Sequence, residues 1–234
     1  PALTRFVQKE PDERAPATDR TEVRYVYDDD ALYVGARMWS NGAVQAPLGR
    51  RDEGDQSEHL IVSLDTYLDR RTASTFGVTA SGVRLDRYHS TDDDFGDDGF
   101  DPVWQARSIV DEHGWTAELW IPFSQLRFND RSPQIWGLNV RRWVPSRNED
   151  VYWALVQRTE RGWASRFGDL VGIDGIGPRR RLELLPYVAS AAHVVGARDA
   201  ANPFDSGANV EGRIGLDMKV GLGSDLTLEA TANP

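Results

Sequence analysis

The sequence contains no cysteine, which excludes disulfide bonds, thiolate metal sites and cysteine nucleophiles and is compatible with either the cytoplasm or the periplasm. Its four histidines show neither HExxH nor HxH spacing, so a zinc hydrolase has little support. The chain also lacks a Gly-x-Ser-x-Gly elbow and a phosphate-binding loop. No apolar run reaches the roughly 18 residues of a membrane span, so we expect no transmembrane helix.

An excess of positive charge is lacking as well. The formal net charge is -10 and the isoelectric point is near 4.9, which argues against a nucleic-acid partner because phosphate binding needs a clustered positive surface. With 234 residues, the chain can bury a good hydrophobic core without help from a metal or a disulfide. We therefore expect one main domain.

The dominant hydrophobic period along the chain is two. In Leu32–Trp39 apolar residues alternate with the others, which is typical of a half-buried antiparallel strand. The same alternation recurs, between turn signals, in Val23–Tyr27, His59–Leu64, Ser74–Ala80, Arg107–Val110, Trp115–Ile121 and Trp136–Trp143. Many short strands at close spacing predict an all-β fold, an antiparallel β-sandwich over residues 1–175.

The glycine-rich segment 172–178 marks a boundary, after which residues 176–234 are expected to form a C-terminal extension of β-strands or a hairpin. Ile214–Leu222 and Leu226–Thr231 carry apolar residues at alternate positions with polar or small residues between them. Strands of about 9–11 residues with this alternation are typical of membrane β-barrels. An ordinary edge hairpin on a soluble sheet explains the same pattern.

Several short motifs, specific through their order, resemble the domain related to family 9 carbohydrate-binding modules. The copy they resemble precedes an outer-membrane-type β-barrel in a large, uncharacterised bacterial family. The motifs are Phe6–Pro11, Pro16–Val23, Tyr27–Gly35, Arg50–Asp52, Leu64–Thr66, Gly114–Glu118, Ile121–Phe123, Leu126–Phe128, Trp136–Asn139 and Trp153. The tail, from Leu182–Tyr187 to Leu226–Pro234, resembles the first barrel strands of that family. The resemblance implies a jelly-roll-like sandwich that binds sugar by stacking it on tryptophans, sometimes with structural calcium.

Strand parity identifies residues that could carry out such binding. Glu118 and Trp120 share one face of their strand, and Asn139, Arg141 and Trp143 share one face of theirs. If the two strands are neighbours, these five side chains form one patch in which an indole stacks on a pyranose and polar groups bind its hydroxyls.

Other tryptophans receive different interpretations. Trp39 lies on the polar face of its strand and is a possible wall of the site, whereas Trp115 and Trp136 are expected in the core. Two alternatives stay open. The carboxylates of Glu118 and Glu149 could simply pair with nearby arginines, and the family pattern places its arginine at Arg142, so that a bulge or another face is possible.

An acidic segment at residues 91–101 is the second chemical candidate. Asp92, Asp94, Asp97 and Asp98 could supply the oxygen ligands that calcium requires. The spacing does not match the EF-hand register, and a solvated loop explains the acidic run equally well. Calcium at these four aspartates is the cofactor for which the sequence offers candidate ligands.

Three functions follow from these features. The first is a non-catalytic glycan-binding module of the cell envelope, periplasmic and associated with the outer membrane. The second is an accessory module that docks onto an envelope protein or a membrane complex, because the apolar strand faces of the tail need a partner. The third is a glycoside hydrolase, which needs two carboxylates at a fixed separation. No such pair stands out, so we expect no catalytic residues.

Overall fold

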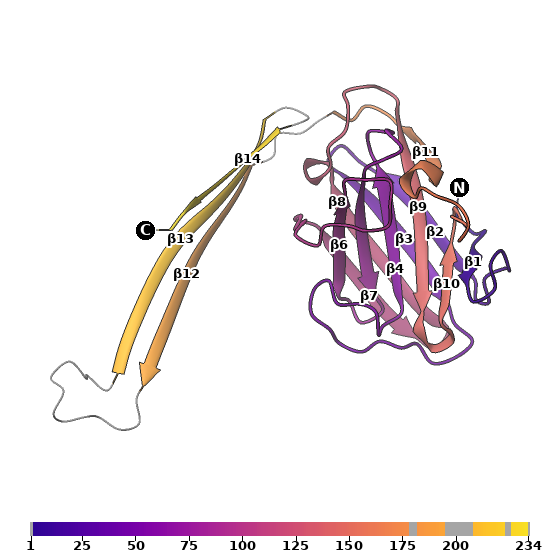
Figure 1. Cartoon of the computed structure of the whole chain (residues 1–234), viewed down its shortest axis with the longest axis horizontal. Helices are drawn as coiled ribbons and strands as arrows, with labels where there is room; N and C mark the ends of the chain where they lie inside the picture. The colour runs from indigo at the N-terminus through magenta and orange to yellow at the C-terminus, as the bar shows by residue number, and fades with distance from the viewer. Residues whose placement is uncertain (1, 178–181, 195–207, 223–225, 234) are drawn as a thin grey trace. The chain divides into compact units, whose positions relative to one another are not determined.

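The structure, a computed structural model, describes residues 2–177, 182–194, 208–222 and 226–233. All regular elements in these ranges are β-strands or short 3-10 segments, and all strand pairs are antiparallel (Figure 1), which confirms the predicted all-β class. The chain divides into two compact units, residues 1–179 and 180–234. Within the described ranges, no helix is long and apolar enough to cross a membrane.

The larger sheet of the sandwich has seven strands. Six of them follow the order β1 (Val7–Glu10), β10 (Glu149–Tyr152), β9 (Gln134–Val144), β4 (His59–Asp65), β5 (Ala73–Thr79) and β6 (Arg84–His89). The seventh, β11 (Gly168–Ile173), pairs with the first half of β9, whereas β10 pairs with its second half. The long strand β9 therefore lies at the centre of this sheet.

The smaller sheet has four strands, in the order β2 (Thr21–Tyr27), β3 (Ala31–Trp39), β8 (Gly114–Pro122) and β7 (Gln105–Asp111). The chain passes from β8 in this sheet to β9 in the larger one through the 3-10 segment η1 (Phe123–Gln125). Two further 3-10 segments, η2 (Pro145–Arg147) and η3 (Ala164–Arg166), lie in the connections after β9 and before β11.

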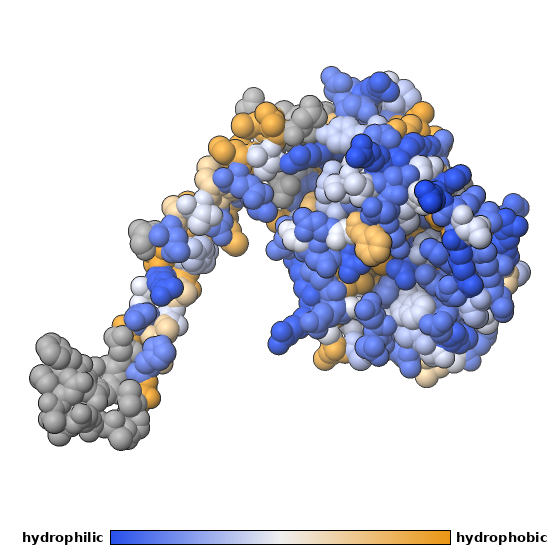
Figure 2. All heavy atoms as spheres, viewed as in Figure 1, coloured by the Kyte–Doolittle hydropathy of each residue, from blue (hydrophilic) through white to orange (hydrophobic). Residues whose placement is uncertain are grey.

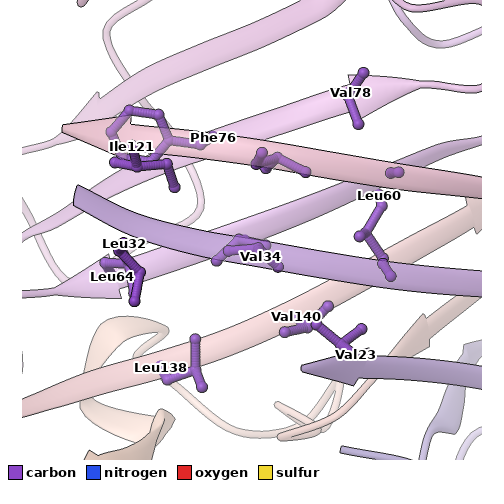
Figure 3. Packing of buried hydrophobic residues seen from close by; sticks show 14 of the residues in the cluster. Val23, Leu32, Val34, Leu60, Leu64, Phe76, Val78, Ile121, Leu138 and Val140 are labelled. Carbon is purple, nitrogen blue, oxygen red and sulfur yellow. The ribbon is translucent and has the colours of Figure 1, made fainter. Parts of the chain in front are cut away.

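The core lies between the two sheets and consists of alternate residues from both. Val34 and Ile121 of the smaller sheet and Leu60, Phe76 and Val140 of the larger one pack together and are almost wholly buried (Figure 3). Trp115 and Trp136 are also fully buried, as the parity of their strands predicts. Burying an aromatic or aliphatic side chain of this size contributes about 1.5–3 kcal/mol, so this interior supplies the main stabilisation of the sandwich.

One ion pair is enclosed within this interior. Arg142 of β9 and Glu58, just before β4, approach to 3.1 Å with side chains 1% and 0% exposed. Glu58 also accepts a hydrogen bond from the indole of Trp115 (3.0 Å), and Arg142 donates to the carbonyl of Trp39 (2.9 Å). The arginine that the family pattern emphasises thus points into the sandwich, where it links the two sheets and is screened from any external ligand.

The third sheet, in the second unit, has three strands: β12 (Leu182–Val194), β13 (Ala208–Leu222) and β14 (Leu226–Ala232). Its register places apolar residues opposite one another on one face, as in the row Leu184, Met218 and Ala230. The other face carries charged residues, including the pair Lys219 and Glu229 (3.4 Å). Apolar side chains, orange in Figure 2, are exposed along this sheet, and they include Leu184, Val188 and Ile214.

Candidate functional site

The two strands that were predicted to form one patch belong to different sheets. β8 lies between β3 and β7 in the four-stranded sheet, whereas β9 lies between β4 and the pair β10 and β11 in the seven-stranded sheet. The assumption that they are neighbours is therefore wrong. Their inner residues face each other across the core, so their outer residues point to opposite sides of the sandwich. Each half of the predicted patch forms a separate surface.

The outer face of the seven-stranded sheet contains a pocket over the middle of β9. Asn139, Arg141 and Trp143 point outward from β9, and their ladder partners on β4 are Ser63, Ile61 and His59. Because directly opposite residues have Cβ atoms only about 4.5–5.5 Å apart, these six side chains form one continuous surface. The pocket is lined by the outer face of both strands of this ladder, by β5, β6 and β10, and by the loops before β4, after β6 and before β11. Its members include His59, Ile61, Ser63, Thr75, Arg87, His89, Asp94, Asn139, Arg141, Tyr152 and Trp163.

The two polar residues predicted on this face, Asn139 and Arg141, have different roles. Asn139 is buried, and its side chain donates to the carbonyl of Ala154 (2.9 Å) and accepts from the backbone N–H of Ala154 (3.0 Å). It therefore holds the chain after β10 against the sheet. Arg141 donates through Nε to Asp150 (2.7 Å). Burial acts to lower the pKa of Arg141, but Tyr152 and Asp150 outweigh it and raise that pKa, so the guanidinium stays charged.

Trp143 lies beside the pocket, at its His59 end. Its indole N–H donates to the carbonyl of Asp55 (3.0 Å), and the ring is half-buried. This bond fixes the ring edge to the loop before β4 and leaves part of the ring accessible. Among the tryptophans predicted for binding, Trp143 is the one that borders this pocket.

Two histidines line the pocket as neutral side chains. The Nδ1 of His59 lies 3.2 Å from the carbonyl of Gly54, and the Nδ1 of His89 lies 3.3 Å from the carbonyl of Asp93. Since a carbonyl only accepts, Nδ1 carries the proton in both rings, and each Nε2 is an acceptor. Both Nε2 atoms are buried, and neither has a hydrogen-bond partner among the described residues. Burial, aided by the charge of Arg141, lowers the pKa of His59 to about 4.

The loops that cover this face bring in residues that the sequence did not suggest. A small apolar cluster seats the segment after β10 on the sheet; it consists of Ala73, Val156, Trp163, Ala164 and Phe167. The ring of His89 lies 4.1 Å from that of Trp163, which occupies part of the indole surface. His59 carries a local signal, because it shares strand parity with Ile61 and Ser63. His89 and Tyr152, at the ends of β6 and β10, and Trp163, in the loop before β11, carry none, since strand order and loop placement bring them to the pocket.

The four aspartates of the acidic segment do not converge on one point. Asp92 accepts hydrogen bonds from the backbone N–H groups of Trp163 (2.8 Å) and Ser165 (2.9 Å), and Asp98 pairs with Arg87. Asp97 caps the N–H of Gly99 (2.8 Å), and Asp94 lines the pocket. In the described part of the chain, no group of three or more acidic or histidine side chains is placed to hold a metal ion. Asp92, Asp97 and Asp98 bind protein groups instead of a common ion.

The other half of the predicted patch lies on the outer face of the four-stranded sheet. Trp120 is paired with Tyr33 and is half-buried, and Glu118 is exposed opposite Gly35. Trp39 lies farther along β3 and is held by two arginines, with Arg20 at 4.4 Å and Arg37 at 5.6 Å from its ring. The alternative that Glu149 simply pairs with an arginine is correct, since it contacts Arg147 at 2.8 Å.

Comparisons with known proteins identify the fold. No family model matches the chain, and no curated protein sequence matches it either. Among solved structures, it is similar to a family 9 carbohydrate-binding module from Caldicellulosiruptor kristjanssonii in complex with cellotriose, with a TM-score of 0.51 and 15% identity over 76% of this chain and 83% of that one. It is also similar to a Bacteroides uniformis ATCC 8492 protein whose proposed role is carbohydrate binding, with a TM-score of 0.59 and 10% identity over 73% of this chain and 85% of that one. The sandwich therefore has a family 9-like fold.

Proposed function

We propose that this protein is a non-catalytic carbohydrate-binding module that binds a sugar across the mouth of the pocket on the outer face of the seven-stranded sheet; the cavity itself, about 60 Å³, admits hydroxyl groups but not a whole ring. The observation that carries the proposal is the set of unused polar groups around this pocket. The buried Nε2 of His59 is an acceptor without a partner among the described residues. Arg141 contacts Asp150 through Nε, so its two terminal amino groups can donate to a ligand. Sugar hydroxyls are both donors and acceptors, so they satisfy both kinds of group.

The apolar part of the lining suits the ring of a sugar. Ile61 forms the floor between His59 and Ser63, while Trp163 and Tyr152 lie at the side. Trp143, at the rim, offers part of its indole for stacking against the C–H groups of a pyranose. Most of the lining is polar or charged, so these few apolar side chains give the ring a contact surface while the polar groups bind its hydroxyls. The likeness to a module solved with cellotriose supports the same ligand class.

The proposal is tested by isothermal titration of the full chain with cellotriose and by a neutral glycan array. His59→Phe removes the acceptor, and Arg141→Lys keeps the charge beside Asp150 but removes the planar fork. Each variant should weaken binding by at least about tenfold. Glu112→Gln, in the exposed turn after β7, is the matched control and should leave affinity unchanged. If both pocket variants bind as tightly as the parent chain, this site is wrong. If the protein hydrolyses a bound glycan, the non-catalytic role is wrong.

We further propose that the protein works in the cell envelope, in the periplasm next to the outer membrane. The three-stranded sheet supports this, because one of its faces exposes many leucine, valine and isoleucine side chains, including Leu184, Val188 and Ile214. Such a face needs an apolar partner, and the start of an outer-membrane-type barrel, which the tail resembles, is one structure that supplies it. Docking onto a membrane protein is the second candidate. Fractionation of native cells tests both: recovery with the cytoplasmic contents would contradict the envelope location, and recovery with the periplasmic contents without detergent would contradict docking onto the membrane.

A further inference from the structure

A shallow groove crosses the outer face of the four-stranded sheet, away from the pocket. It runs over β2, β3 and β8, and the residues around it are Glu22, Arg24, Gly35, Arg37, Thr116 and Glu118. The register places Arg24, Gly35, Glu118 and Arg107 in one row across the sheet. Gly35 stands in the middle of that row and has no side chain, so the backbone of β3 forms the floor of the groove.

No feature of the protein itself requires glycine at position 35. A Cβ atom built there would meet no other atom within 4 Å. Gly77 and Gly137 in the larger sheet differ, because a Cβ would lie 2.9 Å from Ile61 at Gly77 and 2.9 Å from Asp65 at Gly137. Glycine inside a strand costs roughly 0.5–1 kcal/mol relative to alanine. Where no internal contact explains that cost, a close approach by a ligand is the remaining common reason.

Aromatic rings lie at the ends of the groove. On one side, Tyr33 and Trp120 are direct partners across the ladder, and the hydroxyl of Tyr33 donates to Asp28 (2.8 Å), which fixes its ring. On the other side is Trp39, clamped by Arg20 and Arg37. Residues 33, 35, 37 and 39 follow the same face of β3, so the open floor lies in line with both aromatic ends.

The charges beside the groove balance one another, which favours an uncharged ligand. Glu22 and Glu118 oppose Arg24 and Arg37. Glu22 is bound by Arg20 and Arg24, and Arg37 is bound by Asp111, so three of the four are held in place. Glu118 makes no hydrogen bond or ion pair with another described residue, although Arg107 is its ladder partner. A free carboxylate among fixed arginines accepts readily from hydroxyl groups and repels acidic ligands.

We propose that this groove is a second glycan-binding surface, which holds a neutral linear oligosaccharide along β3 with one ring stacked on Trp120 and its hydroxyls bound by Glu118 and Arg24. It is independent of the pocket, because the two lie on opposite sides of the sandwich. A module with two such surfaces can bind one polysaccharide at two points. Linked binding of this kind raises the overall affinity without any new contact.

The test uses the full chain with isotope-labelled tryptophan, whose indole N–H signals are few enough to resolve by NMR. Trp120 reports on the groove and Trp143 on the pocket, each assigned by substitution with phenylalanine. Cellotriose should shift the Trp120 signal, and a linear triuronic acid of equal length should not. Gly35→Tyr should weaken this response by at least about tenfold. Gly35→Ala, which adds a single carbon into open space, should keep most of it.

The possible outcomes separate the two proposals. A shift at Trp143 alone overturns the groove and leaves the pocket, and a shift at Trp120 alone does the reverse. No shift at either signal overturns both. If Gly35→Tyr changes the sedimentation of the sugar-free protein, the face is a protein interface and the groove proposal is wrong. Unfolding midpoints of the glycine variants at or above that of the parent chain show that loss of binding is not loss of the fold.

Discussion

The two outer faces of the sandwich are built from the same alternation of residues, yet they differ in chemistry. Loops cover the face of the seven-stranded sheet, and the histidines beneath them are desolvated and neutral. Within the described part of the sandwich, no loop covers the groove on the four-stranded sheet, and charges there pair across strands in contact with solvent, as Arg37 does with Asp111. Loop coverage, more than strand sequence, therefore decides whether an outward residue becomes part of an enclosed site.

Breaking the ion pair between the sheets shows what loss of the fold does to sugar binding, in contrast to a variant that affects binding at one face alone. Arg142→Met leaves Glu58 buried without its partner, which should cost about 3–5 kcal/mol in the free energy of unfolding and abolish binding at both faces. Urea unfolding followed by tryptophan fluorescence measures the loss. In Arg142→Met/Glu58→Gln, the amide still accepts from Trp115 without a buried charge, so part of the stability should return. An unchanged unfolding midpoint in the single variant would contradict this account.

Acidification should affect the pocket face through His59. Its pKa is about 4 in the folded protein and 6.5 in a model peptide, so between these values the unfolded chain binds a proton that the folded one does not. Stability from this group is complete above pH 6.5 and falls by up to about 3 kcal/mol as the pH drops to 4. His89 has a pKa lowered by burial and acts in the same direction.

The variant His59→Phe isolates that contribution. The difference in unfolding free energy between the parent chain and the variant should change steadily between pH 6.5 and pH 4, and should be constant above this window. A pH-independent difference would show that His59 is accessible and titrates normally.

Strand parity was predictable from sequence, but strand order was not. Trp115 and Trp136 are in the core, and Asn139, Arg141 and Trp143 share an outer face, because alternation is a local property of an extended chain. The passage of the chain through η1 from one sheet to the other depends on long-range packing and has no local signal. That crossover is why one predicted patch became two surfaces.

Replacing one glycine on each outer face by alanine compares how tightly the two faces are packed. Gly35→Ala should stabilise the protein by roughly 0.5–1 kcal/mol, since the new Cβ meets nothing and the unfolded chain loses freedom. Gly77→Ala should destabilise it by about 1–3 kcal/mol, because its Cβ would lie 2.9 Å from Ile61 and 3.2 Å from the carbonyl of Leu60. Paired urea curves measure both. Equal effects at the two sites would mean that the faces are packed alike.

Calcium should have the smallest effect, although the acidic segment lies at the rim of the pocket face. Binding to the folded state alone at a hundredfold excess over Kd would add about 2.7 kcal/mol, or several degrees in Tm. Asp92 is already saturated by the N–H groups of Trp163 and Ser165, and Asp98 by Arg87, so calcium would have to break bonds that hold the loop closed. We therefore expect millimolar calcium and a chelator to give the same Tm within about 1 °C. If calcium instead raises the Tm by several degrees and Asp94→Asn removes this rise, the rim of the pocket is a cation site. A bound metal would then be a further difference between the covered face and the open one.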